Sequence, residues 1–516
     1  MSSRLVASLA VLALMTAGAI ARPAAGPRVA DPEAAPAACE DVARLAAPNI
    51  AISSATTVAA GPFSPAAGGR EFPVPEFCRV VAVASPSPDS QIAIEVWIPT
   101  AAAWNGKLLG TANGGFSGAI PYAPMSAALA RGYATVGTDT GHTGDQVEFA
   151  QGHPEKVTDW AFRAVHVMTE FAKTAVRSAR GRAPDRAYFE GCSTGGQQGL
   201  SEAQRFPSDY DGIVAGDPGH NRVRLIIGFL WGWLALHDDA GKPLMAAGKL
   251  PVITRAAVAA CRKAGPNDTW IDDPASCDFD PAVLACAGAE TDTCLTPLQV
   301  AAVRKVYEGP RNPRTHEQIF PGWDRGSEQG WGTYLLNPAE PVRIGIVRSV
   351  GFGNPTWDFR TFDWDGDVAR LDRALGALPA ISTDLGAFRA RGGKLVMYTG
   401  LADPVSPPQD TINYYDAVTK ASGGSGPTKT FFRFFPVPGM GHCAGGPSPN
   451  TFDALGALEA WVERGQAPDQ LIASHTTNGR IDRRRPICAY PMRARYGGAG
   501  DPDAAESWLC GAQIFR

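Results

Sequence analysis

Ser193 stands at the centre of a Gly-x-Ser-x-Gly pattern that occurs once in the chain, as Gly191-Cys192-Ser193-Thr194-Gly195. Residues 187–190 before the pattern read as a buried strand, and residues 197–205 after it read as a helix. A serine on a sharp turn between a strand and a helix exposes its hydroxyl, and the flanking glycines allow close backbone approach. The pattern therefore predicts an α/β fold of the α/β-hydrolase type, with Ser193 as nucleophile.

A serine hydroxyl becomes a good nucleophile only when a base removes its proton, so a histidine oriented by a carboxylate has to lie within reach. In this fold the chain order is serine, then acid, then histidine, with each partner on a loop after a strand. The predicted strand 394–398 leads into Asp403, and the predicted strand 431–435 leads into His442. One helix-length segment separates the two strands. The order predicts Ser193, Asp403 and His442 as the catalytic residues.

Asp217 is the alternative acid, because it also follows a predicted strand, residues 212–215. The other histidines fit the site less well, since they lie in the predicted lid, lie beyond the last predicted strand or break the expected order. These histidines are His142, His153, His166, His220, His237, His316 and His475.

Backbone N–H groups have to stabilise the negatively charged oxygen that forms during acyl transfer. Thr194, the residue after the nucleophile, is expected to supply one of them. Gly114 or Gly115 is expected to supply the other, because the loop Ala112-Asn113-Gly114-Gly115-Phe116 follows an early predicted strand. The sequence therefore predicts an oxyanion hole formed by Thr194 and this glycine loop.

The chain contains ten cysteines, and none of them forms the paired Cys-x-x-Cys units of a zinc site. In an oxidising compartment the even number favours five disulfides that decorate a large core. Cys192 precedes Ser193 and Cys443 follows His442. A contact between Ser193 and His442 would bring these two cysteines within disulfide distance.

Residues 1–21 have the features of a secretory signal peptide: an early positive charge at Arg4, an apolar run and small residues before the expected cleavage site. A retained membrane anchor is the alternative, but the apolar run is short for a bilayer. Residues 22–38 are rich in alanine and proline and are predicted to be a loose leader. These features predict a secreted or periplasmic protein. The net charge of −4 is spread along the chain, so neither nucleic acid nor a membrane surface is an expected partner.

From about residue 79 short apolar runs alternate with amphipathic stretches, as is typical of an α/β sheet protein. Between residues 214 and 395 this alternation breaks down, in a stretch rich in tryptophan and irregularly spaced proline and glycine. That stretch predicts a large inserted lid. The predicted domains are residues 39–217 as the first part of the core, 218–385 as the lid and 386–516 as the second part of the core. The predicted strands are residues 92–98, 107–110, 134–138, 187–190, 212–215, 394–398 and 431–435, and the predicted helices include residues 159–179 and 197–205.

At these residues the sequence resembles the tannase and feruloyl esterase family, which includes a hydrolase of mono(2-hydroxyethyl) terephthalate. The resemblance extends from about Cys39 to Cys510, and it implies that Ser193, Asp403 and His442 form the triad. A departure is Asp217-Pro218-Gly219, where the family usually has small apolar residues. The motifs that carry the resemblance are Gly191-Cys192-Ser193-Thr194-Gly195-Gly196, Gly400-Leu401-Ala402-Asp403-Pro404, Gly441-His442-Cys443, Thr138-Asp139-Thr140-Gly141-His142 and Cys294-Leu295-Thr296.

The resemblance also implies the disulfide pairing. The implied pairs are Cys192–Cys443, Cys39–Cys78, Cys261–Cys277, Cys286–Cys294 and Cys488–Cys510.

A calcium site in the lid, in the loop after Cys261, is a further implication of the resemblance. Calcium takes six to eight oxygen ligands. This chain has Arg262 where the family tends to place the first aspartate, and Gly265 or Pro266 near the second. Arg262 could instead form a salt bridge with a carboxylate of the loop. The candidate calcium ligands are Asp268, Asp272 and Asp273, and we expect that no cofactor is required.

Together these residues predict a secreted serine esterase that hydrolyses carboxylic esters through an acyl-enzyme. The resemblance implies that the esters are those of aromatic acids, as for a feruloyl esterase. The alternatives are a tannase, a terephthalate monoester hydrolase, an acyltransferase and a catalytically inactive binding protein. Aromatic side chains of the lid are expected to stack on the small-molecule substrate. The candidates are Trp331, Phe352, Trp357 and Phe359. The natural substrate and the oligomeric state stay open.

Overall fold

The computed structural model of the chain describes residues 35–511, apart from residues 67, 263, 264 and 266. The expected signal peptide, residues 1–21, and most of the expected leader, residues 22–38, lie outside the described residues.

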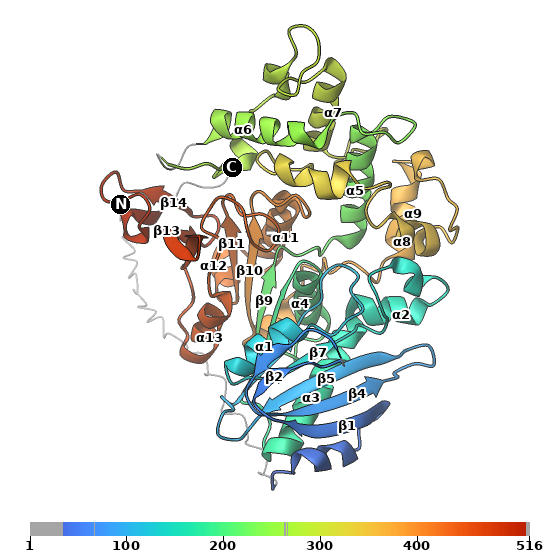
Figure 1. Cartoon of the computed structure of the whole chain (residues 1–516), viewed down its shortest axis with the longest axis vertical. Coiled ribbons are helices and arrows are strands. Elements are labelled where there is room, and N and C mark those ends of the chain that lie inside the picture. The colour runs from blue at the N-terminus through green and yellow to red at the C-terminus, as the bar shows by residue number, and fades with distance from the viewer. Residues whose placement is uncertain (1–34, 67, 263–264, 266, 512–516) are drawn as a thin grey trace, which may run out of the picture. The chain divides into compact units, whose positions relative to one another are not determined.

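A nine-stranded mixed sheet forms the centre of the fold, in the order β1-β4-β5-β7-β6-β8-β9-β10-β11 (Figure 1). The strands from β7 to β11 run parallel to one another, whereas β1, β4 and β5 are paired antiparallel. This arrangement, with helices against the sheet, is the α/β-hydrolase fold that the sequence predicted. The strands are β1 (Ile50–Val58), β4 (Phe77–Ala84), β5 (Ile92–Pro99), β6 (Lys107–Thr111), β7 (Ala134–Thr138), β8 (Arg186–Cys192), β9 (Gly212–Gly216), β10 (Lys394–Gly400) and β11 (Phe432–Val437).

The parallel strands are apolar on both faces because successive side chains of a strand point to opposite sides of the sheet. Phe189 and Ile213 lie in the core that contains side chains of α3, α4 and α11. Their neighbours Tyr188 and Val214 lie in a second core with α13. The helices of this part of the chain are α1 (Tyr122–Ala130), α2 (Pro154–Thr158), α3 (Ala164–Arg180), α4 (Thr194–Arg205), α10 (Gly386–Ala390), α11 (Pro408–Ala421), α12 (Ser425–Lys429) and α13 (Ala454–Arg464).

The seven predicted strands are present, and their ends differ from the predicted ones by at most two residues. The predicted helix 159–179 begins with a wider turn, Asp159–Arg163, before α3, and the helix predicted at 197–205 starts earlier, at Thr194. Strand β1 was not predicted, because its sequence IAISSATTV contains a polar run and most of its side chains are at least partly exposed. Strands outside the main sheet are β2 (Gly61–Phe63), β3 (Phe72–Val74), β12 (Gln470–Thr477), β13 (Arg480–Cys488), β14 (Arg493–Tyr496) and β15 (Trp508–Gly511).

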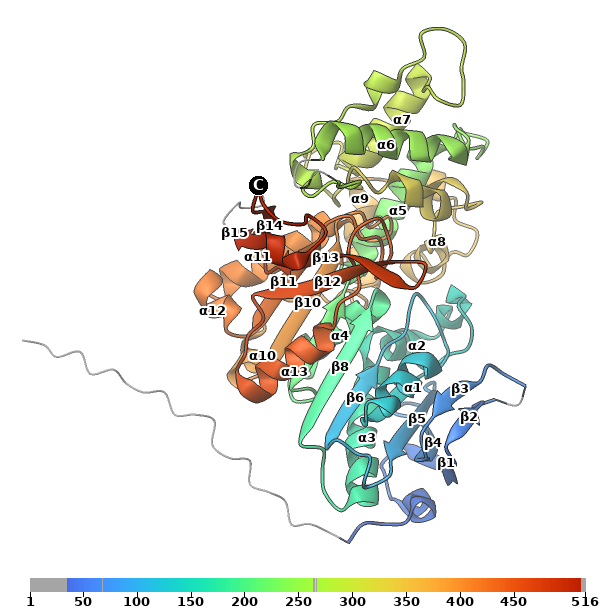
Figure 2. The same cartoon turned by 60° about the vertical axis from the view of Figure 1, so that its left-hand side comes forward.

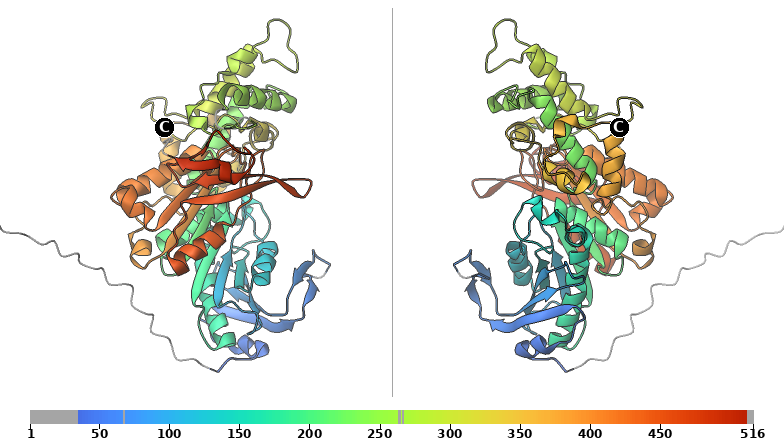
Figure 3. Two further views of the ribbon diagram at one scale, coloured as in Figure 1. Left: turned by 90° about the vertical axis from the view of Figure 1, so that its left-hand side faces the viewer. Right: turned by 90° about the vertical axis from the view of Figure 1, so that its right-hand side faces the viewer.

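The chain between β9 and β10, most of which was predicted to be a lid, forms helices joined by turns and irregular segments. Figures 1 and 2 show them at one end of the sheet, where β9 leads into α5, and the two views of Figure 3 agree. The segment has an apolar core of its own, which includes Trp323 and Trp331. The described chain forms one compact unit, so the predicted boundaries of core and lid stay predictions. The helices of the segment are α5 (Arg222–Leu236), α6 (Leu250–Cys261), α7 (Pro297–Glu308), α8 (Ile344–Ile346) and α9 (Gly366–Ala374).

The start of α7 shows why part of the lid is helical. Thr296 accepts the N–H of Gln299, and the side chain of Gln299 accepts the N–H of Thr296. Pro297 occupies the first position of the helix. A reciprocal cap followed by proline is a strong signal for a helix start, so the Cys294-Leu295-Thr296 motif fixes this end of α7.

All ten cysteines form disulfides. The pairs are the same as those implied by the resemblance: Cys39–Cys78, Cys192–Cys443, Cys261–Cys277, Cys286–Cys294 and Cys488–Cys510. None of the helices within residues 35–511 is long and apolar enough to span a bilayer.

Candidate active site

Ser193 lies on the sharp turn between β8 and α4, with φ 63° and ψ −119°. Its backbone N–H donates to the carbonyl of Gly216 at 2.9 Å, which fixes the turn against the end of β9. A Cβ atom on Gly191 would lie 2.7 Å from the backbone of Gly195, and one on Gly195 would lie 2.5 Å from the Cβ of Ala112. Only glycine fits at both positions, so the pattern around Ser193 is required by close packing.

His442 connects Ser193 and Asp403 through its two ring nitrogens. Nε2 lies 2.8 Å from Oγ of Ser193, and Nδ1 lies 2.7 Å from Oδ2 of Asp403. Asp403 is fully buried, and its other oxygen accepts the N–H groups of Val405 at 2.7 Å and Ser406 at 3.1 Å. The structure therefore brings together the three residues that the sequence singled out, in the geometry of a nucleophile, a base and an orienting carboxylate.

The charge state of His442 depends on two acidic neighbours. Burial lowers the pKa of His442, but Asp403 and then Asp217 raise it, and the net result is a pKa of about 9. The positive charge of Arg222 opposes this rise. In the free protein His442 therefore binds a proton more tightly than an ordinary histidine does.

The glycine loop lies directly beside the turn of Ser193. Oγ1 of Thr194 donates to the carbonyl of Gly115 at 2.8 Å. Asn113 holds the loop, because its side chain donates to the carbonyls of Ala119 and Thr138, each at 2.9 Å. Outside helices and strands, no hydrogen bond of the described chain uses the N–H of Thr194, Gly114 or Gly115. These three N–H groups are the ones predicted for the oxyanion hole.

Two arginines that the sequence did not point to approach this loop. Arg222 is buried and donates to Oγ1 of Thr194 and Oε1 of Gln197, each at 2.8 Å. Arg343, from the lid, places its Nη2 atom 2.6 Å from where a Cβ on Gly115 would lie. Burial lowers the pKa of both arginines. Nothing in the local sequence marks them, because the contacts depend on how the lid folds back onto the core.

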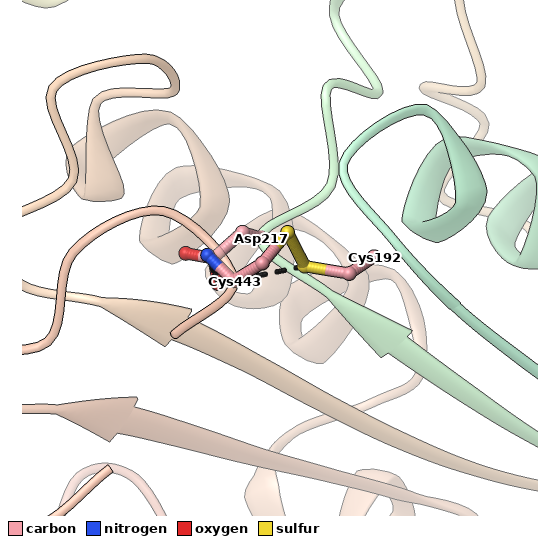
Figure 4. A group of neighbouring side chains, drawn as sticks. All are labelled: Cys192, Asp217 and Cys443. Atoms are coloured by element: carbon pink, nitrogen blue, oxygen red, sulfur yellow. Dashed lines mark hydrogen bonds between the residues drawn. A yellow bond between two sulfur atoms is a disulfide. The ribbon is translucent and has the colours of Figure 1, made fainter. Parts of the chain in front are cut away.

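Asp217, the alternative acid, is not the carboxylate that His442 contacts. It is fully buried beside the Cys192–Cys443 disulfide, and Figure 4 shows its side chain next to Cys443. Most of the other histidines hydrogen-bond to groups other than Ser193, Asp403 and His442. The contacts are His142 with Phe116, His153 with Asp89, His166 with Asp209, His220 with Pro218, His237 with Trp233 and His475 with Asp482.

The four aromatic candidates for substrate stacking occupy different environments. Trp331 has no exposed surface and donates to Oγ of Ser327, and Phe359 is buried edge-on against Trp233. Both are core residues of the lid rather than open surfaces. Phe352 and Trp357 are half-buried and pack against each other, with ring centres 4.3 Å apart.

The loop implied as a calcium site contains arginine–carboxylate pairs. Asp268 is fully buried and accepts two hydrogen bonds from Arg485 of β13, at 2.9 and 3.2 Å. Arg493 forms an ion pair with Asp273 at 2.7 Å. The guanidinium of Arg262 lies 3.5 Å from the backbone oxygen of Asp268 and forms no ion pair with a carboxylate of the described residues, so Arg485 and not Arg262 makes the salt bridge to Asp268.

These residues do not fit a calcium ion. Calcium requires several converging oxygen ligands, and none of the carboxylate clusters with metal-like spacing within the described residues contains Asp268, Asp272 or Asp273. The guanidinium of Arg485 already occupies both carboxylate oxygens of Asp268 and lies 3.5 Å from the ring centre of Trp508. A fixed positive charge therefore stands where a metal would have to bind.

Comparison with known proteins places these residues in a family. The family model described as tannase and feruloyl esterase matches residues 78–511. The chain is 38% identical to an uncharacterised esterase of Xanthomonas campestris, over 92% of this chain and 91% of that protein. It is 34% identical to mono(2-hydroxyethyl) terephthalate hydrolase of Piscinibacter sakaiensis, over 80% of each chain. The crystal structure of feruloyl esterase B from Aspergillus oryzae superposes with a TM-score of 0.87, at 28% identity, covering 92% of this chain and 100% of that one.

Removing the Cys192–Cys443 disulfide should lower esterase activity at least tenfold, because this bond holds the residues next to Ser193 and His442 together. The double substitution Cys192→Ala and Cys443→Ala is compared with Cys286→Ala and Cys294→Ala, which removes a lid disulfide that closes only 8 residues. Initial rates on p-nitrophenyl acetate and melting curves are measured for both. Equal activity losses in the two double variants would contradict the positioning role.

Excess EDTA should leave the melting temperature and the esterase rate unchanged. Arg485→Met should instead lower the free energy of unfolding by about 3–5 kcal/mol, because it leaves the buried Asp268 without its partner. Arg483→Met on the same strand is the control: it breaks the more exposed pair with Asp503 and should cost less than about 1 kcal/mol. A fall in melting temperature with EDTA that calcium, and not magnesium, reverses would show that a calcium site is present.

Proposed function

The chain belongs to the tannase and feruloyl esterase family, whose members are carboxylic ester hydrolases, and on that premise we propose that it hydrolyses esters of aromatic acids with Ser193, His442 and Asp403. The observation that carries the proposal is the unbroken hydrogen-bond chain from Ser193 through His442 to Asp403. Each contact lies within the range of an ordinary hydrogen bond.

In the first step His442 removes the proton of Ser193 while Oγ attacks the ester carbonyl. Asp403 holds the imidazole so that Nε2 faces the serine, and it stabilises the imidazolium that forms. His442 then returns the proton to the leaving alcohol. Water attacks the resulting acyl-enzyme in the second half of the reaction, with His442 again as base. Burial of Asp403 and its two backbone hydrogen bonds support this orienting role.

The oxyanion of each tetrahedral intermediate is bound by the N–H of Thr194 and an N–H of the Gly114-Gly115 loop. The support is geometric: Oγ1 of Thr194 bonds to the carbonyl of Gly115, so the two donor segments are in contact. Arg222 fixes Thr194 from the other side and adds a positive charge near the developing negative charge. Preorganised donors of this kind contribute about 2.7–4 kcal/mol each to transition-state stabilisation.

A terephthalate monoester is the second candidate substrate, and the two arginines favour it. Arg222 is buried and Arg343 is half-buried beside the glycine loop, and their hydrogen-bond partners Thr194, Gln197 and the carbonyl of Asp145 are uncharged. Buried charges are usually paired. A carboxylate on the acyl group would supply the missing partner, which the neutral esters of ferulic and gallic acid do not. A hydroxycinnamate or gallate ester stays the first candidate on family membership alone.

Export and independence from calcium belong to the same proposal. Five disulfides favour an oxidising compartment, outside the cytoplasm. The Asp268–Arg485 pair supports a lid that needs no metal.

The test of substrate class is a rate comparison on methyl ferulate, methyl gallate and mono(2-hydroxyethyl) terephthalate. Rates on all three no greater than on methyl acetate, an aliphatic ester with a similarly poor leaving group, would argue against an aromatic acyl group.

Ser193→Ala should lower ester hydrolysis by about 10⁴- to 10⁶-fold while leaving the melting temperature close to that of the wild type. The control is Ser201→Ala, a buried serine on α4 away from the turn, which should keep most of the activity. Substantial turnover by a clean preparation of Ser193→Ala would remove Ser193 from the mechanism.

The pH dependence should follow the raised pKa of His442. A general base works unprotonated, and the pKa of His442 is raised from 6.5 to about 9. The value of kcat/KM should therefore rise with pH and reach half its maximum near pH 9, in the titration range of His442. A half-maximum near 6.5, the ordinary value, would contradict the influence of the two carboxylates on His442.

A further inference from the structure

Asp217 is a buried carboxylate that the proposed mechanism leaves without a role. It follows β9 directly, has no exposed surface, and lies among the loops that carry Ser193, Asp403 and His442. A lone buried carboxylate is unfavourable unless hydrogen bonds or charges compensate it. The contacts of its side chain therefore indicate what it does.

Both oxygens of Asp217 bind the loops of the site. Oδ1 accepts the N–H of Gly400 at 2.7 Å and the hydroxyl of Thr399 at 3.2 Å, at the end of the strand that leads to Asp403. Oδ2 accepts the N–H of Cys443, the residue after His442, at 3.0 Å. The same oxygen lies 3.8 Å from Sγ of Cys192, the residue before Ser193; this sulfur belongs to the disulfide and has no proton to donate, so the contact is one of packing. Figure 4 shows Asp217 beside the disulfide. The side chain of Asp217 therefore contacts Cys192 beside Ser193, Cys443 beside His442, and the end of the strand that leads to Asp403.

Backbone strain is concentrated at the same place. Ser193, Asp217 and Cys443 all have positive φ angles, 63°, 34° and 65°, although none of them is glycine. Such conformations are unfavourable for residues with a Cβ and persist only when the surroundings hold them. The hydrogen bond from Cys443 to Asp217 and the disulfide from Cys443 to Cys192 are two such restraints on the loop of His442.

The charges of Asp217, Asp403 and His442 are also linked. One ligand atom of each lies within 4.8 Å of the others. Burial, followed by the Asp403 carboxylate, raises the pKa of Asp217 well above its ordinary value, while His442 lowers it. Asp217 in turn raises the pKa of His442 and of Tyr398 on β10, and Arg222 on α5 acts on His442 in the opposite direction. Groups this close titrate together and not one by one.

We propose that Asp217 is a positioning residue of the active site: it anchors the loop of His442 to the end of β10, which leads into Asp403, and places a second carboxyl group beside the Asp403–His442 pair. The inference rests on the proposed function of that pair. It assigns Asp217 two separable effects, one through its hydrogen bonds and one through its charge. The first orients His442, and the second makes the imidazole harder to deprotonate.

Two substitutions separate these effects. Asp217→Asn removes the charge and keeps one acceptor oxygen, whereas Asp217→Ala removes the charge and every acceptor. In both variants the rising limb of the pH profile of kcat/KM should move to lower pH by about one unit and to the same extent, because the same charge is lost. At the pH of maximal rate, kcat should fall by about 10- to 100-fold in the alanine variant and less in the asparagine variant, with KM nearly unchanged.

A second cluster of the same composition provides the control. His166, Glu202 and Asp209 also lie within 4.8 Å of one another, and Glu202 is buried with a pKa raised well above its ordinary value. Glu202 lies nine residues after Ser193 on α4, which corresponds to about 13 Å along the helix. Glu202→Gln therefore perturbs a buried carboxyl group to a similar degree, and should change neither the pH profile nor kcat by more than about twofold.

The outcomes are distinct. A lower pH midpoint in both Asp217 variants, with kcat falling in the order Asp, Asn, Ala, supports the proposal. An unchanged midpoint, or the same shift in Glu202→Gln, overturns it and leaves Asp217 a structural residue. The proposed function is tested independently in the same assay, because wild-type turnover that is lost in Ser193→Ala establishes the nucleophile whatever the Asp217 variants do.

Discussion

The hydrogen bond between His442 and Ser193 joins two loops that are 249 residues apart in sequence, and the rest of the site is arranged around it. Because β8, β9, β10 and β11 are parallel, their carboxyl ends lie at the same end of the sheet. That alone does not set a 2.8 Å contact. The disulfide between Cys192 and Cys443 and the carboxyl group of Asp217 fix the two loops at the residues next to Ser193 and His442. The position of His442 relative to Ser193 therefore depends on the neighbours of the proposed triad as much as on its three members.

Buried charged side chains are the second feature on which the site depends. Negative groups gather behind His442, where they stabilise an imidazolium, and the guanidinium of Arg222 lies beside Thr194, where a negative oxygen would form. The two regions have opposite sign, as charge separation during acyl transfer requires. A further buried charge pair, Asp268 with Arg485, joins the lid loop to β13.

The sequence predicted the main parallel strands, and it singled out Ser193, Asp403 and His442, which the structure brings together. Both depend on local order: an apolar run, a turn pattern, and acid and histidine after successive strands. It predicted less where distant segments meet. Strand β1 was missed because its consecutive Ser and Thr residues interrupt the alternation of apolar and polar side chains that is typical of a strand. Arg222, Arg343 and Arg485 were missed because each acts through a contact made across the fold. Asp217 was recognised only as a rival acid, since its sequence position after β9 does not reveal that it binds Cys443 and Gly400.

Covalent labelling tests most directly the claim that Ser193 is activated by His442 and Asp403. The protein is treated with a serine-directed organophosphate, digested and analysed by mass spectrometry while esterase activity is followed in parallel. The account predicts one adduct, on the peptide that contains Ser193, appearing at the rate at which activity is lost and absent after His442→Ala. Complete labelling of Ser193 with full activity retained, or loss of activity with the adduct on another residue, would contradict it.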